Sequence, residues 1–109
     1  MHVSGTQVGS GQFSQSGLNT GVLDTLSSVF NVSPFSAFVL SVIEASGTIT
    51  GSVITVQVSV NNTDWYDSAV TVAGELISST FSNVTRYMRL KVTTASAIAS
   101  TANILIRGR

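Results

Sequence analysis

Cysteine is absent from this 109-residue chain, and proline, histidine and tryptophan occur once each. Without cysteine the chain has no disulfide framework and no thiolate metal site. The single histidine, His2, lies in a segment rich in Gly and Ser, where no rigid element is expected to hold it as a general base. These absences argue against disulfide-stapled scaffolds, zinc sites and histidine-dependent hydrolases.

Charged residues are also scarce, at 9% of the chain against about 25% in an ordinary globular domain. A free monomer normally carries a richer charged surface for solubility, so the composition favours a protein that works within an assembly. The formal net charge is zero, which does not favour electrostatic binding of nucleic acid.

The few charges are divided along the chain, with all five acidic residues before residue 76 and all five basic residues after residue 85. In one interpretation, two segments of the same chain lie side by side and neutralise each other. In the other, complementary patches meet between subunits. The sequence leaves both open.

Long apolar runs are missing as well. The longest, at residues 37–43, is far shorter than the roughly 20 residues of a membrane-spanning helix, and the amino-terminal residues lack the basic and apolar regions of a secretory signal. With 43% hydrophobic residues, the chain still predicts one folded domain rather than disorder.

The chain does contain a repeated alternation of apolar and polar residues, which is typical of β-strands with one buried face. Residues 54–60 and 84–94 show it best, and Gln57 is expected on the wet face of the first. Shorter strands are expected at 69–73, 76–81 and 103–106. The predicted core residues of the two best segments are Ile54, Val56, Val58, Met88, Leu90 and Val92.

Turn residues separate these segments at roughly 8–12-residue spacing, the pattern of an all-β domain with short strands. The predicted fold is an antiparallel β-sandwich or jelly roll of about six to eight strands over residues 21–109. In residues 35–46 both faces are apolar, with Phe35 on one and Phe38 on the other. This predicts a strand covered on both sides, by a second sheet and by the arm or a neighbouring subunit.

Residues 1–20 differ from the rest in being rich in Gly, Ser, Gln and Thr. Their apolar residues, Val3, Val8, Phe13 and Leu18, fall five apart, which matches neither the helical nor the strand period. The segment is either an extended arm that becomes ordered on a partner or a disordered tail.

No group of residues has the spacing of a catalytic or metal site. Asp64 and Asp67 flank the tryptophan and offer two carboxylates to calcium, but two acids beside a turn more often serve the turn itself. We therefore expect no enzyme activity, no metal and no cofactor.

Trp65 and Tyr66 are the most prominent candidates for contact with a ligand. A lone tryptophan after a hairpin usually packs in the core, so Trp65 is predicted to be a core residue. Tyr66 would then face outward, and it is the better candidate for binding a sugar together with loop residues near Asp64.

Residues 56–68, VQVSVNNTDWYDS, and 86–94, RYMRLKVTT, resemble paired motifs of small β-sandwich structural proteins of tailed bacteriophages. The match spans residues 36–107, with Asn61-Asn62 in place of the usual Asp-Gly turn. The residues that fall on the motifs are Ser59, Trp65, Arg86, Tyr87 and Arg89. Discoidin-like carbohydrate-binding sandwiches share similar strings, so the motifs indicate a fold better than a task.

The resemblance implies a virion component, made in the host cytoplasm, and the short chain favours a capsid decoration or cement protein. Such a protein would bind the outer surface of the head as a homo-oligomer, with itself and a major capsid protein as partners. The alternative is a carbohydrate- or receptor-binding sandwich of a tail, fibre or adhesin. The candidate interface residues are Val3, Val8, Phe13, Leu18, Phe35, Phe38, Tyr66, Arg89, Lys91 and Arg107.

Overall fold

A computed structural model describes residues 11–33, 35–96 and 99–109 of the chain. These residues form strands joined by turns, and they contain no helix. The strands are β1 (Gln12–Asn19), β2 (Phe30–Asn31), β3 (Ala37–Ser46), β4 (Val53–Ser59), β5 (Tyr66–Ala73), β6 (Leu76–Ser82), β7 (Tyr87–Thr94) and β8 (Thr101–Gly108).

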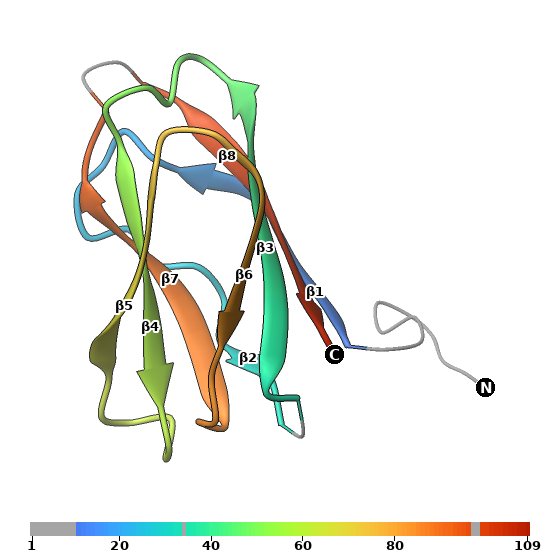
Figure 1. The fold of residues 1–109 in the computed structure, drawn as a ribbon. Helices are drawn as coiled ribbons and strands as arrows, with labels where there is room; N and C mark the ends of the chain where they lie inside the picture. The colour runs from blue at the N-terminus through green and yellow to red at the C-terminus, as the bar shows by residue number, and fades with distance from the viewer. Residues whose placement is uncertain (1–10, 34, 97–98) are drawn as a thin grey trace.

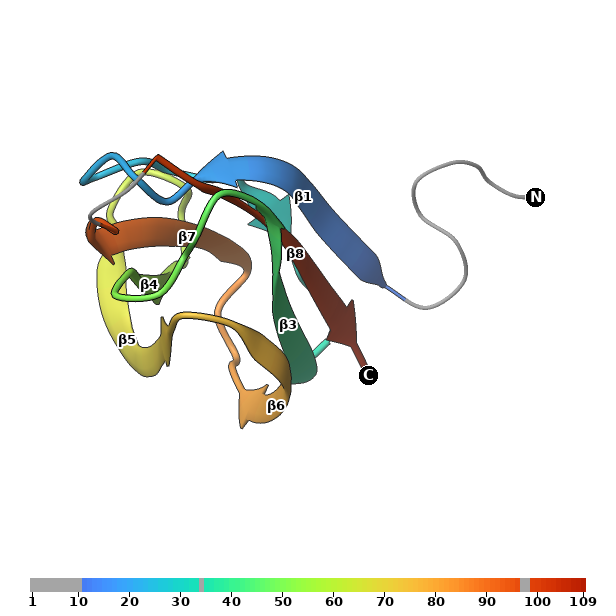
Figure 2. The same cartoon turned by 90° about the horizontal axis from the view of Figure 1, so that it is seen from above.

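The strands build two four-stranded sheets. Sheet A has the order β1-β8-β3-β6 and sheet B the order β2-β7-β4-β5, and every pairing is antiparallel. β1 pairs with β8, β2 with β7, β3 with β6 and β4 with β5, as in a long hairpin rolled into two layers (Figures 1 and 2). This is the strand order of a jelly roll, and the predicted fold class is confirmed.

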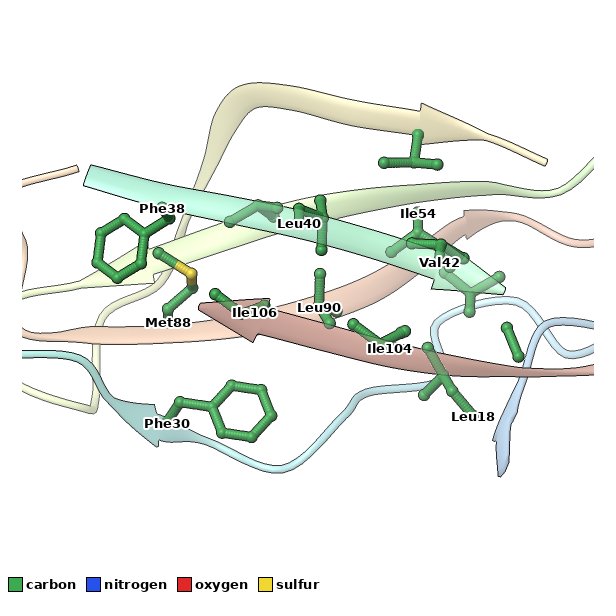
Figure 3. Close-up of a cluster of buried hydrophobic side chains, with 14 of the residues drawn as sticks. Leu18, Phe30, Phe38, Leu40, Val42, Ile54, Met88, Leu90, Ile104 and Ile106 are labelled. Atoms are coloured by element: carbon green, nitrogen blue, oxygen red, sulfur yellow. The ribbon is translucent and has the colours of Figure 1, made fainter. Parts of the chain in front are cut away.

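The core lies between the two sheets, where inward side chains of β3, β4, β7 and β8 interdigitate (Figure 3). Alternation in the sequence identifies these residues correctly, because every second residue of a strand points to the same face. The predicted core residues that are 0% exposed are Ile54, Val56, Met88, Leu90 and Val92. Val58 is partly buried and packs against the same cluster.

The predicted division between an arm and a sandwich at residue 20 is wrong. Residues 12–19 are β1, which pairs with β8 along sheet A. Leu18 is buried in the core at 3% exposure, and the ring of Phe13 lies 5.8 Å from that of Phe30. Both residues are therefore structural rather than anchors on a partner, whereas Val3 and Val8 lie outside the described residues. The spacing of five misled the prediction because β1 contains a bulge between Gln15 and Leu18.

The prediction that Phe38 lies at an interface is also wrong. Its side chain points inward with 1% exposure and stacks on Phe81 of β6 at 5.5 Å between ring centroids. The opposite face of β3, which carries Ala37, Val39 and Ile43, points away from the core, and Ala37 and Ile43 are exposed while Val39 is half-buried.

Phe35, another predicted interface residue, closes one end of the sandwich. Its ring lies directly over Gly11 and Gly108, where an added Cβ would collide with the ring, and it meets Phe13 edge-on at 6.3 Å. The two glycines thus provide the space that the aromatic ring occupies, and Phe35 is half-buried against the core.

Candidate functional site

Three side chains from neighbouring strands form a hydrogen-bonded row on the outer face of sheet B. Arg89 on β7 donates from Nε to Oε1 of Gln57 on β4 over 2.8 Å, and Gln57 donates from Nε2 to Oδ1 of Asp67 on β5 over 2.7 Å. The strand register brings them together, because Gln57 pairs with both Arg89 and Asp67. Gln57 is only 6% exposed, so the expectation that it faces water is wrong: its two charged partners cover it.

The prediction that Trp65 is a core residue is wrong. Its indole is half-buried but belongs neither to the core cluster nor to the side chains packed against it. Instead, Cζ of Arg89 lies 4.2 Å from the centre of the ring, close enough for a cation–π interaction. Trp65 therefore covers the arginine of the row on the outer face of sheet B.

The turn before Trp65 is held by its own polar side chains. Oδ1 of Asn61 accepts hydrogen bonds from the backbone nitrogens of Thr63 and Asp64, and Asn62 has a φ of 62°, a conformation that asparagine tolerates. Asp64 accepts from Nδ2 of Asn61 and Asp67 accepts from Gln57. The two carboxylates thus serve separate networks. In the described part of the chain, no group of three or more His, Asp or Glu side chains is placed to hold a metal.

Tyr66 is 63% exposed, as the sequence predicts, but it is separated from the row described above. It pairs with Val58, which packs against the core, and cross-strand partners share a face of the sheet. The Tyr66 side chain therefore leaves β5 on the side opposite to Asp67. Among the described residues, no hydrogen bond links the Tyr66 side chain to the loop near Asp64, where the sugar site was expected.

The remaining predicted interface cations are dispersed. Nζ of Lys91 lies 3.4 Å from Oδ1 of Asp24, and this is the one ion pair among the described residues. The interpretation that acidic and basic segments of the same chain neutralise each other therefore applies to a single pair of side chains. Arg107 lies on the outer face of sheet A opposite Val39. The basic carboxy-terminal strands thus do not form one patch, because β7 and β8 belong to different sheets.

The outer face of sheet A has a different chemistry. Val39, Ser41 and Ile43 on β3 pair with Arg107, Leu105 and Asn103 on β8. Ile43 is 38% exposed, and Val39 and Leu105 are half-buried. A groove of about 330 Å³ runs over this face, lined by Ser14, Gln15, Ser16, Ser41, Ile43, Asn103, Ile104 and Leu105.

A second hollow lies at the end of the sandwich where Phe35 sits. It has a volume of about 540 Å³ and is lined by Ser33, Phe35, Ser36, Val84, Thr85 and Arg86. Val84 is 90% exposed at its rim. Arg109 reaches the same end, where its backbone nitrogen donates to the carbonyl of Ala37.

The sequence interpretation missed Gln57 as a site residue and gave Trp65 the wrong role. A signal for Gln57 existed, since it is the one large polar side chain between Ile54 and Val60. Its meeting with Asp67 and Arg89, however, depends on the pairing of β4 with β5 and β7. No local pattern contains that pairing.

Comparison of the chain with protein-family models, curated proteins and solved structures finds no match. Among the described residues, no helix is long and apolar enough to cross a membrane.

Proposed function

We propose that the protein is a non-enzymatic structural component of a bacteriophage particle that binds the outer surface of the head as a homo-oligomer. The observation that carries the proposal is the outer face of sheet A, which combines aliphatic side chains and a groove with almost no charge. Solvent-facing sheets usually alternate between an apolar inner and a polar outer face, so an aliphatic outer row favours a covered surface.

The aliphatic row consists of Val39, Ile43 and Leu105, which come from two adjacent strands. Burying apolar area contributes about 25 cal/mol per Å², and exposed apolar patches commonly mark protein interaction sites. We assign this face to contact with another copy of the chain. Arg107 is the one charged side chain among the described outward residues of β3 and β8, so little charge has to be desolvated.

A basic end of the sandwich is assigned to the capsid. Arg107 and Arg109 lie at the end of β8 beside the start of β3, and Arg86, which precedes β7, lines the hollow beside Phe35 and Ser36. None of the three forms an ion pair with another described residue. Unpaired cations at one end favour a partner with acidic groups, since complementary charge guides association and register.

The phage assignment itself rests on the resemblance of residues 56–68 and 86–94. Three of the residues that match the motifs, Ser59, Trp65 and Arg89, lie close together. Trp65 lies on Arg89, and Oγ of Ser59 accepts hydrogen bonds from backbone nitrogens of the turn that precedes Trp65. Viral capsid and lectin domains both use jelly rolls, so the topology is compatible with the proposal but does not carry it.

The copy-to-copy contact is tested by the mass of the protein in solution. We expect an oligomer by light scattering, and Ile43→Glu and Leu105→Glu should each shift the mass towards the monomer by placing a charge on the aliphatic row. The matched control is Thr71→Glu, an exposed position on the other sheet, which should leave the mass unchanged. A monomeric parent protein, or equal effects of all three substitutions, contradicts the assignment.

The capsid contact is tested by sedimentation with purified capsids. We expect the parent protein to cosediment, and Arg107→Glu with Arg109→Glu to weaken binding, with a reduced dependence on salt. Ile43→Glu serves as a comparison, because it alters the oligomer without changing the basic end. Failure of the parent protein to bind capsids contradicts the proposed function.

A further inference from the structure

The outer face of sheet B differs from that of sheet A in carrying an aromatic ring beside fixed polar groups. We propose that Trp65, Arg89 and Asp67 form a binding site for a neutral glycan, in which the indole packs on a pyranose ring and the two charged side chains bind its hydroxyls. This site is independent of the proposed assembly through sheet A.

The polar groups of the site are held in place before any ligand arrives. Gln57 is almost fully buried and links Arg89 to Asp67 through two hydrogen bonds of 2.8 and 2.7 Å. Its amide can be oriented in only one way, because the guanidinium requires an acceptor and the carboxylate requires a donor. Groups fixed in this manner lose little conformational freedom on binding, which favours affinity.

Hydrogen-bonding capacity remains on both charged side chains. The bonds to Gln57 use Nε of Arg89 and Oδ1 of Asp67. Within the described residues, neither the terminal Nη nitrogens of Arg89 nor Oδ2 of Asp67 has a hydrogen-bond partner, and Asp67 is exposed. A half-buried guanidinium with unused donors and an exposed carboxylate with an unused acceptor thus lie on one sheet surface.

Trp65 supplies the apolar part of the site. Its contact with the Arg89 guanidinium at 4.2 Å restrains the indole, and its partial exposure leaves part of the ring accessible on the outer face. A pyranose has the complementary chemistry, with C–H groups on the faces of the ring and hydroxyls around its edge. Sites for such ligands combine an aromatic surface with a few well-placed polar groups.

The surroundings favour a neutral glycan over other ligands. The site contains one cation, Arg89, and one anion, Asp67, which are both hydrogen-bonded to Gln57, and the chain has no net charge. Binding of nucleic acid requires an excess of cations instead. A protein contact of high affinity usually has an apolar centre, but the outward residues of β4 next to the site are Thr55, Gln57 and Ser59.

The test uses Trp65 as its own reporter, because it is the only tryptophan. Its fluorescence is followed while the full chain is titrated with short linear oligosaccharides of glucose, galactose, mannose and N-acetylglucosamine. A single-stranded oligonucleotide and an oligogalacturonate serve as charged probes. We expect a saturable change with at least one neutral oligosaccharide and none with the two polyanions.

Substitutions then separate the site from its neighbours. Arg89→Lys removes the planar fork and Asp67→Asn removes the charge of the acceptor, and each should weaken binding about tenfold or more. Trp65→Ala, measured by calorimetry, should abolish it. Tyr66→Ala is the matched control: it removes the adjacent exposed aromatic ring from the opposite side of the strand and should leave the dissociation constant unchanged. Circular dichroism establishes that each variant is folded.

Three results overturn the proposal. The first is the absence of a saturable response to every neutral oligosaccharide, and the second is a response to the polyanions alone. The third is an equal loss of binding in the Tyr66 and Trp65 variants. If Trp65→Ala instead abolishes cosedimentation with capsids while no sugar binds, the face is a protein contact.

Discussion

Truncation of Trp65 to alanine distinguishes a surface role from a core role. The ring lies on Arg89 outside the core, so its removal loses a cation–π interaction and some partly buried area but creates no internal cavity. A cation–π contact contributes about 0.5–1 kcal/mol at exposed sites and about 2 kcal/mol when desolvated. We expect Trp65→Ala to reduce the free energy of unfolding by about 1–2 kcal/mol.

A tryptophan in the core would give a larger effect, because the lost transfer free energy and the cavity together cost about 3–5 kcal/mol. The internal standard is Leu90→Ala, at a side chain that is 0% exposed, for which about 2–5 kcal/mol is expected.

The assay is urea unfolding followed by far-ultraviolet circular dichroism, because the variant has lost the only tryptophan as a fluorescent probe. All proteins are compared at one concentration, since association shifts apparent stability. A loss for Trp65→Ala as large as that for Leu90→Ala, with an unchanged m-value, would refute the surface placement of the indole.

Three further predictions concern the fold and are measured in the same way. Phe38→Ala should lower the unfolding free energy by about 3–5 kcal/mol, because the ring is buried rather than at an interface; a small loss would contradict this. Gly47→Ala should lower the unfolding free energy far more than Gly17→Ala. Both glycines have a φ of 65°, but a Cβ added at Gly47 would collide with the backbone of Ala99 and Ser100, whereas a Cβ added at Gly17 would meet no atom within 4 Å. Equal losses of unfolding free energy in the two variants would show that the positive φ, and not the collision with the backbone, causes the loss. Ser27→Ala should cost about 1–3 kcal/mol, because Oγ of Ser27 accepts the backbone hydrogen bond of Leu90 over 2.8 Å; no loss would mean that another acceptor replaces it.

The strands that alternate cleanly were predictable. In β4 and β7 one face is aliphatic and the other polar, so the period of two indicates both the strand and its buried face. The antiparallel sandwich follows from the number and spacing of such segments.

For the strand at 37–46, the alternation of residues does not predict which face is buried. With Phe38 and Leu40 on one face and Val39 and Ile43 on the other, alternation cannot say which face meets the second sheet. The structure decides it by placing the bulkier set against β7, and this leaves the other set outside. Residues 12–19 were missed because a bulge interrupts the alternation and their partner, β8, lies at the far end of the chain.

The sequence by itself thus determined the fold class, most of the strands and the inner faces of β4 and β7, since these depend on local periodicity. Only the tertiary structure decided what the outer faces carry. Gln57 and Arg89 are 32 residues apart, and they meet with Trp65 because β4 and β7 are neighbours in sheet B. The contact of the tryptophan outside the core is therefore a consequence of strand pairing, which fixes the Arg89 guanidinium on the buried Gln57 amide and places it against the indole ring.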